Sequence, residues 1–128
     1  MNEEVRKTSN FQELGSWQQA HGFVLWVYRE TKTFPKEELF GLTSQFRRAA
    51  VSIAANIAEG YKKTGKADKL RFFNIAQGSL EECRYYLILS NDLEYIKKET
   101  FQDGTLLIES TSKLLNAYCK AIHNSITS

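Results

Sequence analysis

The clearest hydrophobic pattern of the chain lies between Leu42 and Tyr61. Apolar side chains recur there every three or four residues, which predicts an amphipathic helix. The residues of this stripe are Leu42, Phe46, Ala49, Ile53 and Ile57. The hydroxyl of Thr43 is expected to cap the start of the helix. Gly60 is expected to end it in the left-handed conformation, with Tyr61 packing back onto the last turn.

The other sides of this helix are unusual for a free surface. One carries mostly small residues: Arg47, Val51, Ala54, Ala55 and Ala58. The other carries polar ones: Gln45, Arg48, Ser52, Asn56 and Glu59. Short side chains let a second backbone approach closely, so we expect this helix to be covered on more than one side. Gln45, Ser52, Asn56 and Glu59 are interpreted as interface or core hydrogen-bonding residues, and a functional polar site is the alternative.

A first helix is predicted over residues 11–33, before the region just described. Its apolar stripe is Leu14, Trp17, His21, Val24 (or Leu25) and Tyr28. Pro35 ends this helix because proline cannot donate to the helical ladder and forces its predecessor into an extended conformation. His21 is interpreted as a hydrogen-bonded core or interface residue, with a metal or catalytic role as the alternative.

A third helix is predicted over residues 67–91, and it is apolar over a wide arc. One stripe is Leu70, Phe73, Ala76, Leu80, Cys83 and Leu87, and a second is Phe72, Ile75, Ser79, Tyr86, Leu89 and Leu93. Gly78 in mid-helix costs about 1 kcal/mol relative to Ala, which a neighbouring helix that approaches there would offset. Phe72 and Gly78 are therefore assigned to an oligomer interface together with the polar residues Gln45, Ser52, Asn56 and Glu59.

A fourth helix is predicted over residues 101–126, after a loop at 92–99. Its inward-facing residues are expected to be Leu107, Thr111, Leu114, Leu115, Tyr118 and Ile122. Four long helices joined by short links predict an all-α fold, an antiparallel up-down four-helix bundle. Residues 11–128 form its single domain, and residues 1–10 are expected to be frayed or disordered.

Composition supports a globular protein with no membrane segment. The chain has 128 residues, of which 42% are hydrophobic and 25% charged. No apolar run approaches the 18 residues of a membrane span, and the polar N-terminus lacks the apolar region of a signal peptide. Cys83 and Cys119 are too few for a disulfide framework and lie on apolar stripes. We interpret them as reduced core residues of a cytoplasmic protein.

Positive charge is concentrated in the middle of the chain. Residues 41–71 hold seven basic and two acidic side chains, a net charge of +5, whereas the whole chain has a net charge of +2. The candidate nucleic-acid-binding residues are Arg47, Arg48, Lys62, Lys63, Lys66, Lys69 and Arg71. Two alternatives stay open. The lysines can belong to a solvated helix junction, and the two arginines can pair with Glu37, Glu38 or Glu59 at a subunit interface.

Motifs of known enzymes and cofactor proteins are missing from the sequence. It contains no His-Glu-x-x-His, no Cys-x-x-Cys and no Gly-x-Ser-x-Gly. A di-iron bundle needs Glu-x-x-His pairs, but Gln18 precedes His21 and Lys120 precedes His123 at that spacing. The Gly65-Lys66 pair lacks the rest of a phosphate-binding P-loop. We therefore predict no catalytic residue, no metal site and no cofactor, and interpret the Glu37-Glu38 and Glu81-Glu82 pairs as solvated.

Several segments together resemble one protein family. They are residues 11–14 (FQEL), 17–18, 20–21, 34–38 (FPKEE), 42, 45, 47–49 (RRA), 51–53 (VSI), 56–60 (NIAEG), 72, 75–76 and 78–82 (GSLEE). The pattern resembles the bacterial 23S rRNA-intervening sequence proteins, also called S23 ribosomal proteins, over about residues 11–95. The last helix is similar only in its hydrophobic pattern.

The resemblance implies an up-down bundle that assembles into a ring, with a pentamer expected. It also implies likeness to the accessory protein of diversity-generating retroelements, which binds nucleic acid and a reverse transcriptase. No catalytic residues are attached to the family. Two functions are therefore weighed: a non-enzymatic oligomer that binds RNA or DNA through its basic residues with little sequence specificity, and a scaffold whose partner is another protein.

Overall fold

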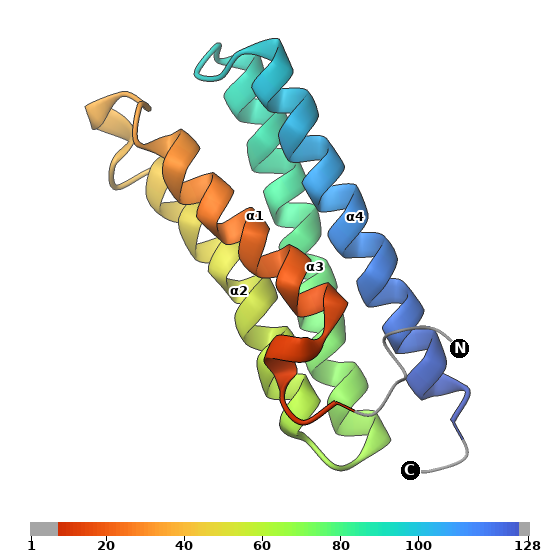
Figure 1. Ribbon diagram of the computed structural model, residues 1–128. Helices are drawn as coiled ribbons and strands as arrows, with labels where there is room; N and C mark the ends of the chain where they lie inside the picture. The colour runs from red at the N-terminus through yellow and green to blue at the C-terminus, as the bar shows by residue number, and fades with distance from the viewer. Residues whose placement is uncertain (1–7, 126–128) are drawn as a thin grey trace.

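The structure is a computed structural model that describes residues 8–125 and contains four long helices and no strand in that range (Figure 1). The helices are α1 (Gly15–Thr31), α2 (Leu42–Lys62), α3 (Lys66–Asp92) and α4 (Lys98–His123). Two short 3-10 helices, η2 (Phe11–Glu13) and η3 (Lys36–Glu38), precede α1 and α2. None of the helices described is long and apolar enough to cross a membrane.

The helices form a four-helix bundle around one core. Helix α1 packs against α2 and α4, and α3 packs against the same two neighbours. Links of a few residues join α2 to α3 and α3 to α4, and the two connections lie at opposite ends of the bundle in Figure 1. Large side chains from all four helices fill the centre, among them Phe23, Phe46, Phe73 and Leu115. The prediction of an all-helical four-helix bundle is confirmed.

The predicted core stripe of α3 is confirmed over most of its length. Phe73, Ala76, Leu80, Cys83 and Leu87 are all buried, and only Leu70 at the helix start is half-buried. The second stripe lies at the edge of the core, where Ile75 and Leu93 are exposed. Helix α3 therefore has one face in the core of its own chain and leaves part of its wide apolar arc uncovered.

The predicted apolar stripe of α1 is confirmed only in part: Leu14 is buried, and Trp17 and Val24 are half-buried against the core. The buried side chains of the helix are Ser16, Ala20, Phe23, Trp26, Val27 and Thr31, with Leu14 just before it. His21 and Tyr28 of the predicted stripe are exposed, and Trp17 is half-buried with its ring stacked on His21 at 4.9 Å between centroids. Two apolar stripes run along this helix, and the one that contains Phe23 and Val27 packs into the core.

The helix α4 begins three residues earlier than predicted, and its core face is partly as expected. Thr111, Leu115 and Tyr118 are buried together with Gly104 and Ile108, which the predicted stripe omitted. The predicted inward residues Leu107, Leu114 and Ile122 are half-buried. The helix ends at His123, three residues before the predicted end at residue 126, and most of the N-terminal segment 1–10 falls outside the described residues.

The expected caps of α2 are wrong at both ends. Gly41 precedes the helix, and the carboxylate of Glu38 accepts a hydrogen bond from the Leu42 amide at 3.1 Å, so Thr43 already lies inside the helix. Gly60 is helical and has no positive φ. A Cβ atom on Gly60 would lie 2.5 Å from a ring carbon of Phe73. This glycine therefore permits the close approach of α2 and α3 and does not end the helix.

Candidate nucleic-acid interface

The link between α2 and α3 gathers three of the predicted cationic residues, and two of them lie over one aromatic ring. The ammonium group of Lys63 lies 5.1 Å from the ring centre of Phe72, and the guanidinium carbon of Arg71 lies 4.5 Å from it. Cation–π contacts of this length hold a charged group in place without neutralising it. Lys62 is exposed beside them at the end of α2. In the described part of the chain the single ion pair of this group joins Arg71 to Asp68 at 3.6 Å.

Lys66 and Lys69 lie in the same region, but their ammonium groups bind helix ends. Lys66 donates to the carbonyl oxygens of His123 at 3.2 Å and Ser125 at 2.6 Å, at the end of α4. Lys69 donates to the carbonyl oxygens of Gly60 at 3.4 Å and Tyr61 at 2.6 Å, at the end of α2. Cations at these positions satisfy unpaired carbonyls and oppose the negative end of the helix dipole.

Burial lowers the pKa of the Lys69 ammonium, which fits a lysine packed between two helices. A charge that is already bonded to backbone carbonyls is less available to a phosphate than one held only by a ring. The structure therefore divides the five basic residues of this region. Lys62, Lys63 and Arg71 point their charge outward, whereas Lys66 and Lys69 hold the ends of the bundle together. We call Lys62, Lys63 and Arg71 the basic end.

The two predicted arginines do not join the basic end. Arg47 and Lys62 are fifteen residues apart on the same helix, or about 22 Å at 1.5 Å per residue. The Nε of Arg47 donates to the Thr31 hydroxyl at 2.8 Å, and its guanidinium lies 4.8 Å from the ring centre of Tyr28. Arg47 therefore fastens the end of α1 to the first turns of α2.

Arg48 is exposed and lines a hollow of about 270 Å³ between α2 and α3, together with Gln45, Ala49, Glu82 and Tyr86. The Tyr86 hydroxyl lies 3.1 Å from the Gln45 side-chain oxygen and 3.0 Å from a Glu82 carboxylate oxygen. The pKa of the Tyr86 hydroxyl is raised, mainly by its loss of contact with solvent and in addition by the nearby Glu82 carboxylate. Within the part of the chain that the structure describes, neither Arg47 nor Arg48 forms an ion pair. Their pairing with another subunit stays a prediction.

The residues predicted for an oligomer interface fall into two groups. Ser52 and Asn56 are half-buried and engaged within the chain, since the Ser79 hydroxyl donates to Ser52 at 2.8 Å and Asn56 donates to the Ser52 carbonyl at 2.8 Å. Gln45, Glu59 and Gly78 are exposed, and a Cβ atom on Gly78 would meet no described atom within 4 Å. Phe72 is half-buried under its two cations. Contacts of any of these six residues with another copy stay a prediction.

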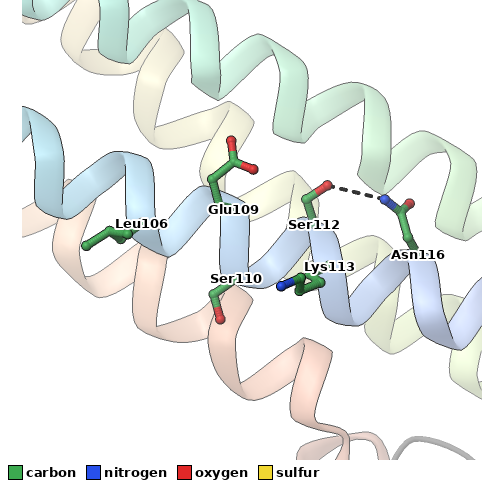
Figure 2. Close-up of a pocket in the computed structure, with 6 residues that line it drawn as sticks. All are labelled: Leu106, Glu109, Ser110, Ser112, Lys113 and Asn116. Atoms are coloured by element: carbon green, nitrogen blue, oxygen red, sulfur yellow. Dashed lines mark hydrogen bonds between the residues drawn. The ribbon is translucent and has the colours of Figure 1, made fainter.

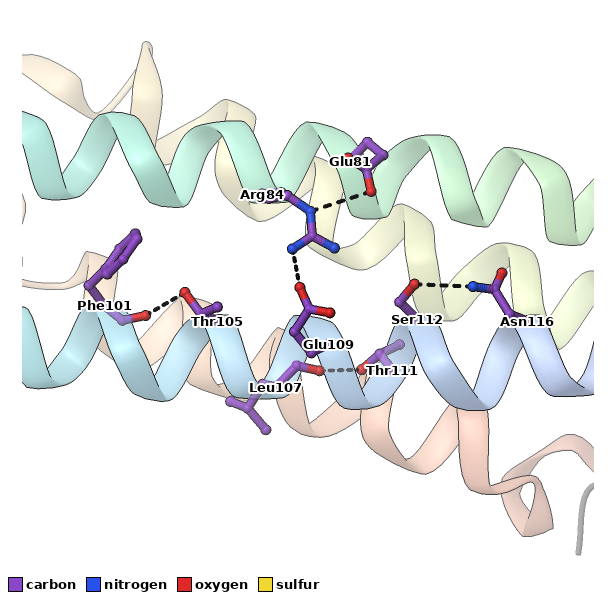
Figure 3. A network of polar contacts seen from close by, with 9 residues as sticks. All are labelled: Glu81, Arg84, Phe101, Thr105, Leu107, Glu109, Thr111, Ser112 and Asn116. Carbon is purple, nitrogen blue, oxygen red and sulfur yellow. Dashed lines mark hydrogen bonds and ion pairs between the residues drawn. The ribbon is translucent and has the colours of Figure 1, made fainter.

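A polar seam between α3 and α4, which the sequence did not predict, lies on another face of the bundle (Figure 3). Arg84 of α3 forms ion pairs with Glu81 at 3.4 Å and with Glu109 of α4, and the latter raises the pKa of Arg84 most. Gln77 and Asn116 are also hydrogen-bonded across the seam. Both pairs are exposed, so they set the register of the two helices more than they stabilise them.

Next to this seam, a hollow of about 510 Å³ runs along the outer side of α4 (Figure 2). Its lining comes from α4 alone and includes Leu106, Ser112 and Lys113. The Asn116 amide lies 3.5 Å from the Ser112 hydroxyl there, and Ser110 donates to Gln19 of α1 at 3.2 Å. One helix with scattered polar groups supplies no convergent set of ligands, so we assign no site to this hollow.

The described residues contain no metal-binding cluster and no activated thiol. No cluster of three or more His, Cys, Asp or Glu side chains able to hold a metal lies between residues 8 and 125. Burial raises the pKa of both thiols, that of Cys119 to about 11. Both thiols are therefore protonated at neutral pH, and a protonated thiol is a poor nucleophile.

Comparison with known proteins decides the family. The sequence model of the 23S rRNA-intervening sequence protein family matches residues 12–117. The chain belongs to this family. A crystal structure at 1.70 Å resolution from Bacteroides thetaiotaomicron, described as a protein with unknown function from the S23 ribosomal protein family, superposes with a TM-score of 0.76 at 27% identity. The match covers 82% of this chain and 95% of that one. Among curated proteins no match is found.

Membership of the 23S rRNA-intervening sequence protein family confirms the resemblance stated from the sequence. The matched range includes every candidate contact, from Gln45 to Gly78, and extends through most of α4, where the sequence showed only a similar pattern. Neither the family description nor that of the solved structure names an enzymatic activity. The function of this member of the 23S rRNA-intervening sequence protein family must therefore be argued from its own surface.

Proposed function

We propose that this protein is a non-enzymatic oligomer that binds nucleic acid through the phosphate backbone. The observation that carries the proposal is the basic end, where Lys62, Lys63 and Arg71 share one region with a single described counterion, Asp68. Ordered, unneutralised cations are suited to phosphate oxygens, and such contacts carry little sequence information. Phe72 acts as the support that holds two of these cations in position.

The proposal includes assembly of antiparallel up-down bundles into a ring, with five copies expected from the family resemblance. A ring would repeat the basic end around one axis, and the sum of several modest patches gives a stronger field than one chain supplies. Exposed apolar residues on the helix faces support assembly, among them Leu25, Val51, Ile75 and Ile88. The partners we propose are therefore further copies of the chain and RNA or DNA.

Paired charge reversals test the basic end. The variant Lys62→Glu/Lys63→Glu is compared with Lys97→Glu/Lys98→Glu, which makes the same charge change at the start of α4. Binding of structured RNA and duplex DNA is measured at several salt concentrations, and oligomer mass is recorded on the same samples. We expect only the first variant to bind more weakly and to flatten the salt dependence, by about 0.7–0.9 in logarithmic slope for each phosphate that is no longer neutralised.

Two results would remove the proposal. One is a wild-type oligomer that binds neither nucleic acid at low salt. The other is an equal drop in affinity in both variants, since that would report overall charge and not a site. Phe72→Leu adds a milder probe. It leaves the charge unchanged, and weaker binding with an intact oligomer is expected because Lys63 and Arg71 lose their support.

The second candidate function is a protein-binding scaffold, and a specific observation favours it. Phe40, between η3 and α2, is 92% exposed, and Leu106 on α4 is 69% exposed. Aromatic side chains such as that of Phe40 are enriched in the cores of protein–protein interfaces. Phe40→Ser would abolish capture of such a partner and leave nucleic-acid binding intact, so the two functions are separable by experiment.

A further inference from the structure

A hollow of about 250 Å³ lies where the end of α1 meets the start of α2, at the far end of α2 from Lys62. Three cationic side chains line it, Lys32, Lys36 and Arg47, and no acidic residue does among those described. None of these three forms an ion pair with another residue between 8 and 125. The hollow therefore concentrates positive charge with no partner from its own chain.

The first turn of α2 adds neutral hydrogen-bond donors to this charge. Thr43 lines the hollow and is only 4% exposed, yet its hydroxyl makes no hydrogen bond to any residue in the described range. The Leu42 amide is occupied by Glu38, whereas the amides of Thr43 and Ser44 have no described acceptor. Unpaired amides at a helix start, aligned with the helix dipole, are a common binding site for anions.

Arg47 is held in place for such a role. Its Nε donates to the Thr31 hydroxyl at 2.8 Å, and that hydroxyl in turn donates to the Val27 carbonyl at 2.7 Å. One terminal nitrogen lies 3.5 Å from the Tyr28 carbonyl oxygen, and the other has no partner among the described residues. The guanidinium is therefore oriented by α1 while keeping donors for a ligand.

The remaining lining is apolar and shapes a small cavity. Phe34 is buried, Leu39 is half exposed, and Pro35 lies between them in sequence. A volume of about 250 Å³ lies just below the usual range of roughly 300–1,000 Å³ for small-molecule pockets. It suits a ligand with one ring and one charged group.

We propose that this hollow binds a small organic phosphate, with the phosphate at Thr43, Lys36 and Arg47 and the organic group against Phe34 and Leu39. Several cations together with unpaired amides match the three terminal oxygens of a phosphate better than the two of a carboxylate. The negative charge of Glu38, at the same helix start, repels an anionic ligand. Two hydrogen bonds stabilise that charge within the chain, one from the Leu42 amide and one from the Tyr95 hydroxyl at 2.8 Å. This site is separate from the basic end and does not depend on the proposed function.

Titration of the ¹⁵N-labelled full chain with phenyl phosphate at constant ionic strength tests the site. Saturable shifts of the Thr43 and Ser44 amide signals are expected, with inorganic phosphate and benzoate binding more weakly. Thr43→Val removes one hydroxyl at constant shape, and Lys36→Gln removes one exposed charge. Each should weaken the binding of phenyl phosphate by about tenfold or more, as the loss of one charge-assisted hydrogen bond does.

Matched controls keep the result interpretable. Lys120→Gln removes an exposed lysine near the end of α4, away from the hollow, and should leave the affinity unchanged. Well-dispersed spectra establish that each variant is folded, and Thr43→Ser, which keeps the hydroxyl, should bind as the wild type does. Absence of saturable shifts at these amides, benzoate binding as tightly as phenyl phosphate, or an equal effect of Lys120→Gln would each overturn the assignment.

Discussion

Gly104 of α4 marks a close helix contact in the core, and its replacement by alanine tests the packing described above. A Cβ atom there would lie 2.5 Å from the Cη2 of Trp26 on α1 and 3.0 Å from a methyl carbon of Leu87 on α3. Carbon atoms in ordinary contact lie about 3.5–4.0 Å apart. The Trp26 ring is rigid and buried, so it can move only if its helix moves.

Two opposing effects decide the outcome of Gly104→Ala. Alanine is favoured over glycine inside a helix by about 1 kcal/mol. Overpacking of a filled core costs about 1–3 kcal/mol, and an overlap near 1 Å with an indole ring belongs at the upper end of that range. We therefore expect a net loss of about 1–2 kcal/mol in the free energy of unfolding.

Gly22→Ala is the matched control because it makes the same change inside α1. A Cβ atom on Gly22 would meet nothing within 4 Å, so only the propensity gain of about 1 kcal/mol applies. Urea unfolding followed by circular dichroism measures both variants, at equal protein concentration. A Gly104→Ala protein as stable as Gly22→Ala would refute the close approach of α1 and α4 at this point.

A double-mutant cycle isolates the contact itself. Trp26→Phe removes the two ring atoms nearest to the added methyl group, Cη2 and Cζ2. Combined with Gly104→Ala, it should therefore be less damaging than the sum of the two single changes. We expect a favourable coupling of about 1 kcal/mol or more, within the usual range for residues in contact, and a coupling near zero would contradict the geometry.

Three further predictions concern single side chains. Lys66→Gln and Lys69→Gln should each lower the free energy of unfolding by about 0.3–1 kcal/mol, because a cation leaves a helix end, and 0.5 M salt should reduce the loss in urea denaturation. Tyr95→Phe should be less stable than the wild type below pH 10, because the hydrogen bond to Glu38 raises the Tyr95 pKa above its ordinary value of 10.0. The stabilisation from that bond is fully present below the pKa of Tyr95 in the unfolded protein, and it is lost as the pH rises through the higher pKa of Tyr95 in the folded protein. The melting temperatures of the two proteins should therefore converge above pH 10. Gly78→Ala should lower the oligomer mass in analytical ultracentrifugation if Gly78 contacts another copy, and an unchanged mass with higher thermal stability would exclude that role.

The sequence predicted the four helices from their apolar periodicity, and the predicted stripe of α3 that contains Phe73 and Leu87 does face the core. In α1 two stripes compete, and periodicity alone does not say which one faces the core. Trp17, His21 and Tyr28 are large enough to look like core residues, whereas Ala20 gives no such signal although it is fully buried. The choice depends on the partner helices, which the local pattern of one segment does not contain.

The candidate site was predictable in composition but not in geometry. The net charge of residues 41–71 predicted one basic patch, yet the helix between Arg47 and Lys62 places these two residues far apart. The hydrogen bonds of Lys66 to helix carbonyls depend on the end of α4, more than fifty residues further on, whereas those of Lys69 reach back to the end of α2. No sequence pattern predicted the hollow beside Thr43. The sequence shows only its three cationic residues, Lys32, Lys36 and Arg47, at separate positions.

The contacts of Thr8 and Ser125 have a practical consequence for any fusion or tag. The Thr8 hydroxyl lies 2.7 Å from that of Tyr61 near the end of α2, and the Ser125 carbonyl accepts from Lys66 at the start of α3. The chain therefore enters and leaves the described bundle on either side of Lys62 and Lys63. A domain fused directly at Thr8 or Ser125 would begin beside the basic end and compete with a nucleic acid there, whereas an insertion between Leu93 and Lys97 would project from the opposite end and leave it open.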